Sequence, residues 1–90
     1  GMYVWVHLNA HVSSVWKTSS GSYVMNITDG TGYMDVYVPF SVVNLTGPAD
    51  LESLEGENVS VTGSLQWYGS FMSGYWEIVP GTLDDIRVIP

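Results

Sequence analysis

Residues 22–38 read SYVMNITDGTGYMDVYV, and this stretch decides the fold of the chain. On both sides of residues 29–32 (DGTG), apolar residues alternate with polar or aromatic ones, which is the period of a strand with one buried face. The two glycines can adopt positive φ angles, as a tight turn between antiparallel strands requires. The stretch therefore predicts a β-hairpin.

The same alternation predicts which face of the hairpin is buried. A shift of the register by one residue would expose the whole apolar set, so the pattern should hold the register in place. The expected buried set is Tyr23, Met25, Ile27, Met34, Val36 and Val38. The expected outer set is Val24, Asn26, Thr28, Tyr33, Asp35 and Tyr37. Its mixture of aromatic, amide and hydroxyl groups indicates a surface presented to a ligand.

Composition and charge limit the class of protein. The 90 residues are 46% hydrophobic and contain no apolar run near the roughly 18 to 20 residues that cross a bilayer, so we expect a soluble globular protein and no membrane segment. Residues 1–90 should form one domain, with Gly1 a remnant of cloning. The absence of cysteine excludes disulfides and thiol chemistry. Only Lys17 and Arg87 are cationic and the net charge is -7, which excludes a basic groove for phosphate.

The rest of the chain predicts further strands and one helical segment. Strands are expected at residues 3–12, 58–67 and 75–79, with a last short strand within 83–89. Ser13 and Ser14 indicate a bulge or bend after the first strand. Between the hairpin and residue 58, a proline, early carboxylates and Gly56 predict one short helix or helical turn that plugs one end of a barrel.

The alternation also predicts the core. The expected least accessible residues are Val6, Leu8, Met25, Ile27, Val36, Val59, Val61, Leu65 and Ile86. Trp67 and Trp76 in the later strands also fall at inward positions and are expected to be buried, and Val4 shares the strand face of Val6 and Leu8.

Five strands with a helix between the third and the fourth is the order of the oligonucleotide/oligosaccharide-binding barrel, the OB-fold. Three segments carry this resemblance: SSVWKTSSGSYVMNITDGTGYMDVYVP (13–39), LEGENVSVTGSLQWY (54–68) and DDIRVI (84–89). The chain resembles OB-fold domains of the type attached to nucleases, helicases and other nucleic-acid proteins. The resemblance implies an all-β, five-stranded Greek-key barrel with one short helix between strands three and four.

The resemblance also implies where a ligand lies. In OB-folds the ligand crosses the outer face of strands two and three, flanked by the loops that join strands one to two and four to five. The corresponding residues here are Trp16, Lys17, Asn26, Thr28, Tyr33, Tyr37, Tyr68, Phe71 and Tyr75. Aromatic stacking contributes about 1 to 3 kcal/mol per base, so we expect a non-catalytic module that binds single-stranded DNA or RNA with few phosphate contacts.

Other interpretations of these residues remain open. Tyrosines also brace neighbouring strands, and an exposed aromatic face suits docking of a protein partner or a neighbouring domain, or, less favoured, an oligosaccharide. His7 and His11 are about 13 Å apart on an extended strand and cannot share one metal ion. Asp29 is expected to bond its own turn. No motif supports catalysis, a metal site or a cofactor.

Overall fold

The computed structural model describes residues 4–45, 51–70 and 72–89. Its elements in chain order are β1 (Val4–Lys17), β2 (Tyr23–Thr28), β3 (Tyr33–Val38), α1 (Phe40–Leu45), the 3₁₀ helix η1 (Leu51–Leu54), β4 (Asn58–Gly69), β5 (Gly74–Val79), the 3₁₀ helix η2 (Leu83–Asp85) and β6 (Ile86–Val88). Strands dominate and the α-helix lies between the third and fourth of them, so the predicted class is confirmed.

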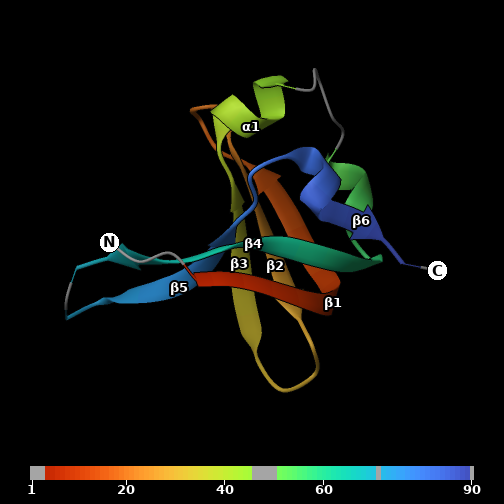
Figure 1. Cartoon of the computed structure of the whole chain (residues 1–90), viewed down its shortest axis with the longest axis horizontal. Coiled ribbons are helices and arrows are strands. Elements are labelled where there is room, and N and C mark those ends of the chain that lie inside the picture. The colour runs from red at the N-terminus through yellow and green to blue at the C-terminus, as the bar shows by residue number, and fades with distance from the viewer. Residues whose placement is uncertain (1–3, 46–50, 71, 90) are drawn as a thin grey trace.

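Five of the strands form a closed ring (Figure 1). Their order is β1-β2-β3-β5-β4, and β4 pairs back with β1. All pairs in the ring are antiparallel except β3 with β5, which are parallel. The short β6 pairs with the start of β4. The later part of the same edge of β4 pairs with β5. The fold is therefore an all-β barrel with one additional strand.

The long β1 closes the ring because it pairs with two strands. Its first half pairs with β4 and its second half with β2, and the register shifts between Val12 and Ser14. The predicted bulge is confirmed at this place. Around it, the backbone N–H of Val12 donates to the carbonyl of Glu57, and the N–H of Gly56 donates to the carbonyl of Val12. The bulge thus bends β1 where the chain enters β4.

The hairpin of β2 and β3 has the predicted register and turn. Met25 pairs with Val36 and both are buried, whereas Asn26 pairs with Asp35 on the outer face. Gly30 adopts a φ of 95° in the turn. The Oδ1 atom of Asp29 accepts hydrogen bonds from the N–H and the hydroxyl of Thr31 at 2.9 and 2.6 Å, and the hydroxyl bond is the main reason that the pKa of Asp29 is lowered.

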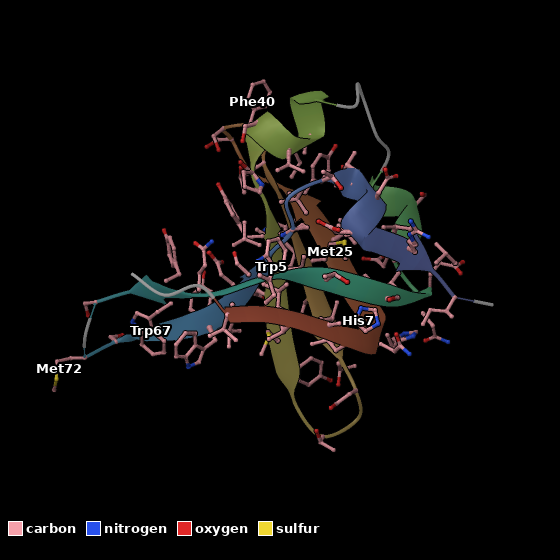
Figure 2. The ribbon with its side chains drawn as sticks, in the orientation of Figure 1. Trp5, His7, Met25, Phe40, Trp67 and Met72 are labelled. Carbon is pink, nitrogen blue, oxygen red and sulfur yellow. The ribbon has the colours of Figure 1, made fainter. Side chains whose placement is uncertain are left out.

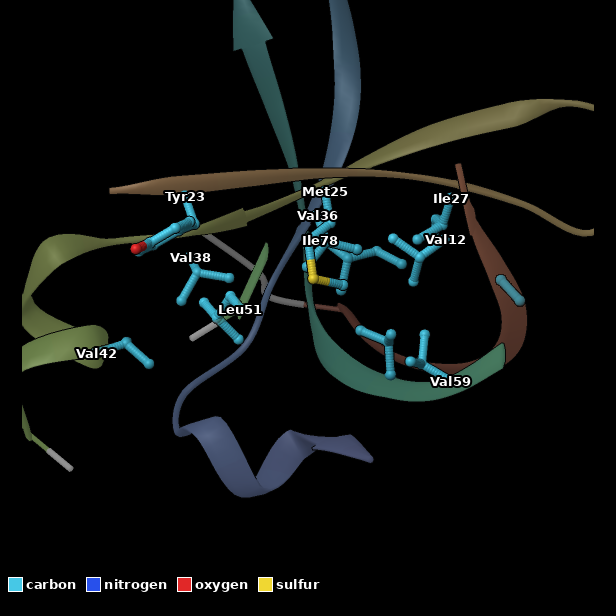
Figure 3. Close-up of a cluster of buried hydrophobic side chains, with 12 residues drawn as sticks. Val12, Tyr23, Met25, Ile27, Val36, Val38, Val42, Leu51, Val59 and Ile78 are labelled. Atoms are coloured by element: carbon cyan, nitrogen blue, oxygen red, sulfur yellow. The ribbon is translucent and has the colours of Figure 1, made fainter. Parts of the chain in front are cut away.

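The core fills the inside of this ring (Figure 3). It consists of Ala10, Val12, Tyr23, Met25, Ile27, Val36, Val38, Val42, Leu51, Val59, Val61 and Ile78. Five predicted core residues are among them, namely Met25, Ile27, Val36, Val59 and Val61. The other four, Val6, Leu8, Leu65 and Ile86, are partly buried and pack against this cluster.

The helical segment covers one end of the barrel. The predicted short helix between the third and fourth strands is confirmed as α1. The proline, carboxylate and glycine signals lie further along the chain, around the 3₁₀ helix η1, which follows residues 46–50 that lie outside the described residues. Val42 of α1 and Leu51 of η1 are buried in the core cluster. Gly56 adopts a φ of 87° just after η1, as expected for a glycine that ends a helical turn.

Trp67 and Trp76 correct the prediction that they are buried. They are 44% and 50% exposed, because the far parts of β4 and β5 extend beyond the barrel as a two-stranded arm with Met72 near its tip (Figure 2). A strand pattern marks an inward face, but burial also needs an opposing layer, and the arm has passed the core. Val4, the first described residue of β1, is exposed as well and pairs with Leu65 where β4 leaves the barrel.

Candidate nucleic-acid interface

Four polar side chains form one row across the outer face of the barrel. Asn26 of β2 pairs with Asp35 of β3, and Asp35 in turn pairs with Glu77 of β5. Glu77 also pairs with Gln66 of β4. Paired positions project from the same face of a sheet, so two amides flank two carboxylates. We call Asn26, Asp35, Glu77 and Gln66 the polar row.

The centre of the polar row is electrostatically unfavourable. Glu77 is only 7% exposed, and burial raises the pKa of its carboxyl, with the neighbouring Asp35 as the second cause. Asp35 is better satisfied, since the Nδ2 of Asn26 donates to its Oδ1 at 3.2 Å. Gln66 directs its Nε2 to the hydroxyl of Ser64 at 2.8 Å. None of the described residues donates a hydrogen bond to the carboxylate of Glu77.

Three tyrosines flank the polar row on one side. Tyr33 and Tyr75 each precede a carboxylate of the row by two residues, and Tyr68 follows Gln66 by two residues. Tyr33 is 72% exposed. Tyr68 and Tyr75 are paired across β4 and β5, with ring centroids 5.4 Å apart. We call Tyr33, Tyr75 and Tyr68 the aromatic row; it offers flat apolar surfaces beside a line of hydrogen-bonding groups.

The two carboxylates of the polar row also affect the phenol of Tyr75. Burial raises the pKa of Tyr75, and Glu77, Asp35 and Tyr68 add to the effect in that order. The phenol of Tyr75 therefore stays protonated throughout the neutral range and remains a hydrogen-bond donor.

Trp16 and Tyr37 border the polar row on its other side. Trp16 pairs with Val24, and Val24 pairs with Tyr37, so these three side chains share the outer face. The Tyr37 hydroxyl donates to the Oγ of the buried Ser22 at 3.0 Å, and this bond braces the tyrosine against the loop between β1 and β2. Trp16 is exposed and available for contact.

Two other predicted site residues, Lys17 and Thr28, do not join this group of exposed side chains. Lys17 pairs with the inward-facing Tyr23 and so lies on the opposite face of the sheet from Trp16. The Thr28 hydroxyl donates to the carbonyl of Gly32 at 2.7 Å, which commits it to the turn. Phe71 lies outside the described residues. The structure brings together Trp16, Asn26, Tyr33, Tyr37, Tyr68 and Tyr75 on one continuous outer face.

The sequence-based site omitted two features. Asp35, Glu77 and Gln66 were visible as outward positions in alternating strands, but only the β3–β5 pairing reveals that they adjoin. Trp67 and Trp76 form a second aromatic pair on the other face of the arm, with ring centroids 5.3 Å apart and planes inclined by 74°. The Trp67 indole donates to the carbonyl of Ser70, which orients its ring.

A cavity of about 250 Å³ opens next to Tyr33, where β1 approaches the turn between β2 and β3. Its lining is mainly apolar, from Leu8, Ile27 and Met34, with Asp29 and Thr31 at the turn.

The two histidines lie away from this cavity, on the outer face of the β1–β4 pair. His7 is hydrogen-bonded to Thr62, and His11 to Asn58.

Neither the described part of the structure nor comparison with known proteins identifies a metal site, a membrane-spanning helix or a family for this chain. Within residues 4–45, 51–70 and 72–89, no three or more His, Asp or Glu side chains are grouped so that they could hold a metal ion. A search of the same residues for a helix long and apolar enough to cross a membrane finds none. Comparison of the sequence with models of known protein families and with curated protein sequences finds no match.

Proposed function

We propose that this chain is a non-catalytic OB-fold module that binds single-stranded nucleic acid, mainly by stacking bases on the aromatic row. The observation that carries the proposal is the position of three exposed tyrosine rings directly beside the polar row on the β2–β3–β5–β4 face. Stacked bases present their edges sideways, where amides and carboxylates can accept and donate hydrogen bonds. The strand order and the helix between β3 and β4 support the OB-fold assignment.

The charges predict how such binding differs from that of a basic protein. With only two cations and a net charge of -7, long-range attraction of phosphate is absent. Displacement of counterions by at most two cations gives a slope of log affinity against log salt shallower than about -2. Binding therefore depends on stacking and on hydrogen bonds to the bases.

A substitution at Tyr33 tests the proposal. We expect Tyr33→Ala to weaken binding of a fluorescently labelled oligonucleotide by about 1 to 3 kcal/mol, because one stacking surface is lost. Tyr33→Phe keeps the ring and should bind nearly as well as the wild type. The measurement is fluorescence anisotropy at two salt concentrations, with circular dichroism to verify folding. Absence of binding at low salt, or a steep salt dependence, would contradict the proposal.

A second candidate function is docking of a protein partner or neighbouring domain. The exposed Trp67–Trp76 pair and the exposed Met72 favour it, since aromatic residues and methionine are enriched in the cores of interfaces. In this case Trp76→Ala should abolish self-association or partner capture, whereas Tyr33→Ala should leave it unchanged. A panel of soluble glycans in the same assay tests oligosaccharide binding, the remaining use of an aromatic face.

A further inference from the structure

Glu77 is a buried acceptor that lacks a donor. The residue is only 7% exposed, and no described residue forms a hydrogen bond with its carboxylate. No described side-chain oxygen or nitrogen that is sealed from solvent lacks a partner, so the free carboxylate oxygens of Glu77 reach the surface of the outer face. Burial of most of this residue disfavours the ionised carboxylate, and a hydrogen-bond donor bound at the outer face would offset that cost.

The neighbours of Glu77 supply neither a hydrogen-bond donor nor a positive charge to its carboxylate. Asp35 on β3 adds a second negative charge, while Gln66 on β4 donates its amide to Ser64. The phenols close by belong to Tyr75 on the same strand and to Tyr68 on β4. Lys17 and Arg87, the cations of the chain, belong to β1 and β6, outside the strands of the polar row. No described side chain therefore donates to Glu77, and its oxygens are open to a donor on a molecule bound at the outer face.

We propose that the Glu77 carboxylate, backed by Asp35, binds the Watson–Crick edge of a guanine whose ring stacks on the aromatic row. This inference rests on the proposed function and adds a base preference to it. Guanine presents two adjacent donors, N1–H and the N2 amino group, which match the two oxygens of one carboxylate in a bidentate, charge-assisted pair. The Watson–Crick edge is also the part of the nucleotide farthest from its own phosphate. The carboxylates of the polar row therefore contact the base and not the phosphate backbone.

The other bases fit this carboxylate less well. Thymine and uracil present one N–H between two carbonyl oxygens, and those oxygens are repelled by Glu77 and Asp35. Adenine and cytosine present one amino donor beside a ring nitrogen that accepts, so only half of the bidentate contact forms. A glutamine at position 77 would reverse the order, because a side-chain amide offers one acceptor and one donor and pairs with adenine.

A proton competes with guanine for the same oxygens. Burial and Asp35 raise the pKa of Glu77, so the proton is retained to a higher pH than in an ordinary glutamate. The preference for guanine should therefore increase as the pH rises through the pKa of Glu77. The pKa of Tyr75 is raised, so its phenol stays neutral over this range and contributes no change of charge.

The test uses labelled oligothymidines of about eight nucleotides in which one central base is thymine, guanine, hypoxanthine or adenine. Hypoxanthine keeps N1–H but lacks the amino group. Anisotropy titrations at low salt should give the affinity order guanine, hypoxanthine, thymine, with guanine about 5-fold to 100-fold above thymine. Glu77→Gln should lose this ratio and its pH dependence, and should favour adenine. Glu52→Gln removes the same charge from the exposed start of η1 and should preserve the wild-type order.

Three results would overturn the inference. If all four strands bind equally and Tyr33→Ala still weakens them, the base preference is refuted while the proposed function stands. If no strand binds, both are refuted. If a lysine- or arginine-rich peptide binds in place of the oligonucleotides and Glu77→Gln abolishes that binding, the carboxylate pair is a site for a cationic protein partner.

Discussion

The replacement of Gly63 by alanine tests how tightly β4 and β5 are packed where the barrel closes. Gly63 is buried in β4 and pairs with Val6 of β1. A Cβ atom at this position would lie 2.7 Å from the carbonyl oxygen of Val79 and 2.8 Å from the Cγ2 of Ile78. The carbonyl contact is with the backbone, so β4 and β5 must separate before an alanine fits.

The expected loss of stability follows from these contacts. Overpacking of a well-packed core costs about 1 to 3 kcal/mol, and the entropy that alanine removes from the unfolded chain recovers only about 0.4 to 1 kcal/mol. For a domain of this size each 1 kcal/mol lowers Tm by about 4 to 8 °C. We therefore expect Gly63→Ala to be clearly destabilised in thermal and urea unfolding followed by tryptophan fluorescence.

Gly32 provides the matched control. A Cβ atom there has no neighbour within 4 Å, and Gly32 is not among the glycines with positive φ. Gly32→Ala should therefore leave Tm unchanged or raise it slightly through the unfolded chain. A Gly63→Ala domain as stable as the Gly32→Ala domain would refute the close approach of β4 and β5 at this position.

Three further substitutions test the core, the loop and the buried carboxylate. Val61→Ala should cost on the order of 1 to 4 kcal/mol in urea unfolding, because Val61 is wholly buried and a cavity remains. Ser22→Ala should cost about 1 to 3 kcal/mol, because the Ser22 hydroxyl accepts hydrogen bonds from the Tyr37 hydroxyl and the Phe40 N–H; Ser41→Ala, at an exposed position, should cost little in the same assay. The pKa of Glu77 is raised on folding, so the wild type should lose stability as the pH rises from the unfolded pKa through the folded one. Glu77→Gln lacks this loss, and its stability relative to the wild type should be greater at about pH 8 than at about pH 4; an unchanged difference would show that Glu77 is not desolvated.

Local features of the chain could be predicted because their causes are local. The β2–β3 hairpin, its buried Met25 and Val36, and the Asp29 turn follow from two-residue periodicity and from glycine and aspartate turn chemistry. The bulge near Ser14 and the helical turn that ends before Gly56 follow from signals within a few residues of each other. The aromatic character of the outer face was predictable for the same reason, since alternation assigns Tyr33 to the face opposite the core.

Only the tertiary structure decided the features that depend on pairing between distant strands. Periodicity assigns Trp67 and Trp76 to an inward face, but β4 and β5 outrun the barrel, so no second layer covers these rings. Likewise, the sequence shows Asp35 and Glu77 as separate outward carboxylates. The parallel pairing of β3 with β5 is non-local and makes them neighbours, so the burial of Glu77 and its raised pKa arise from the closure of the ring.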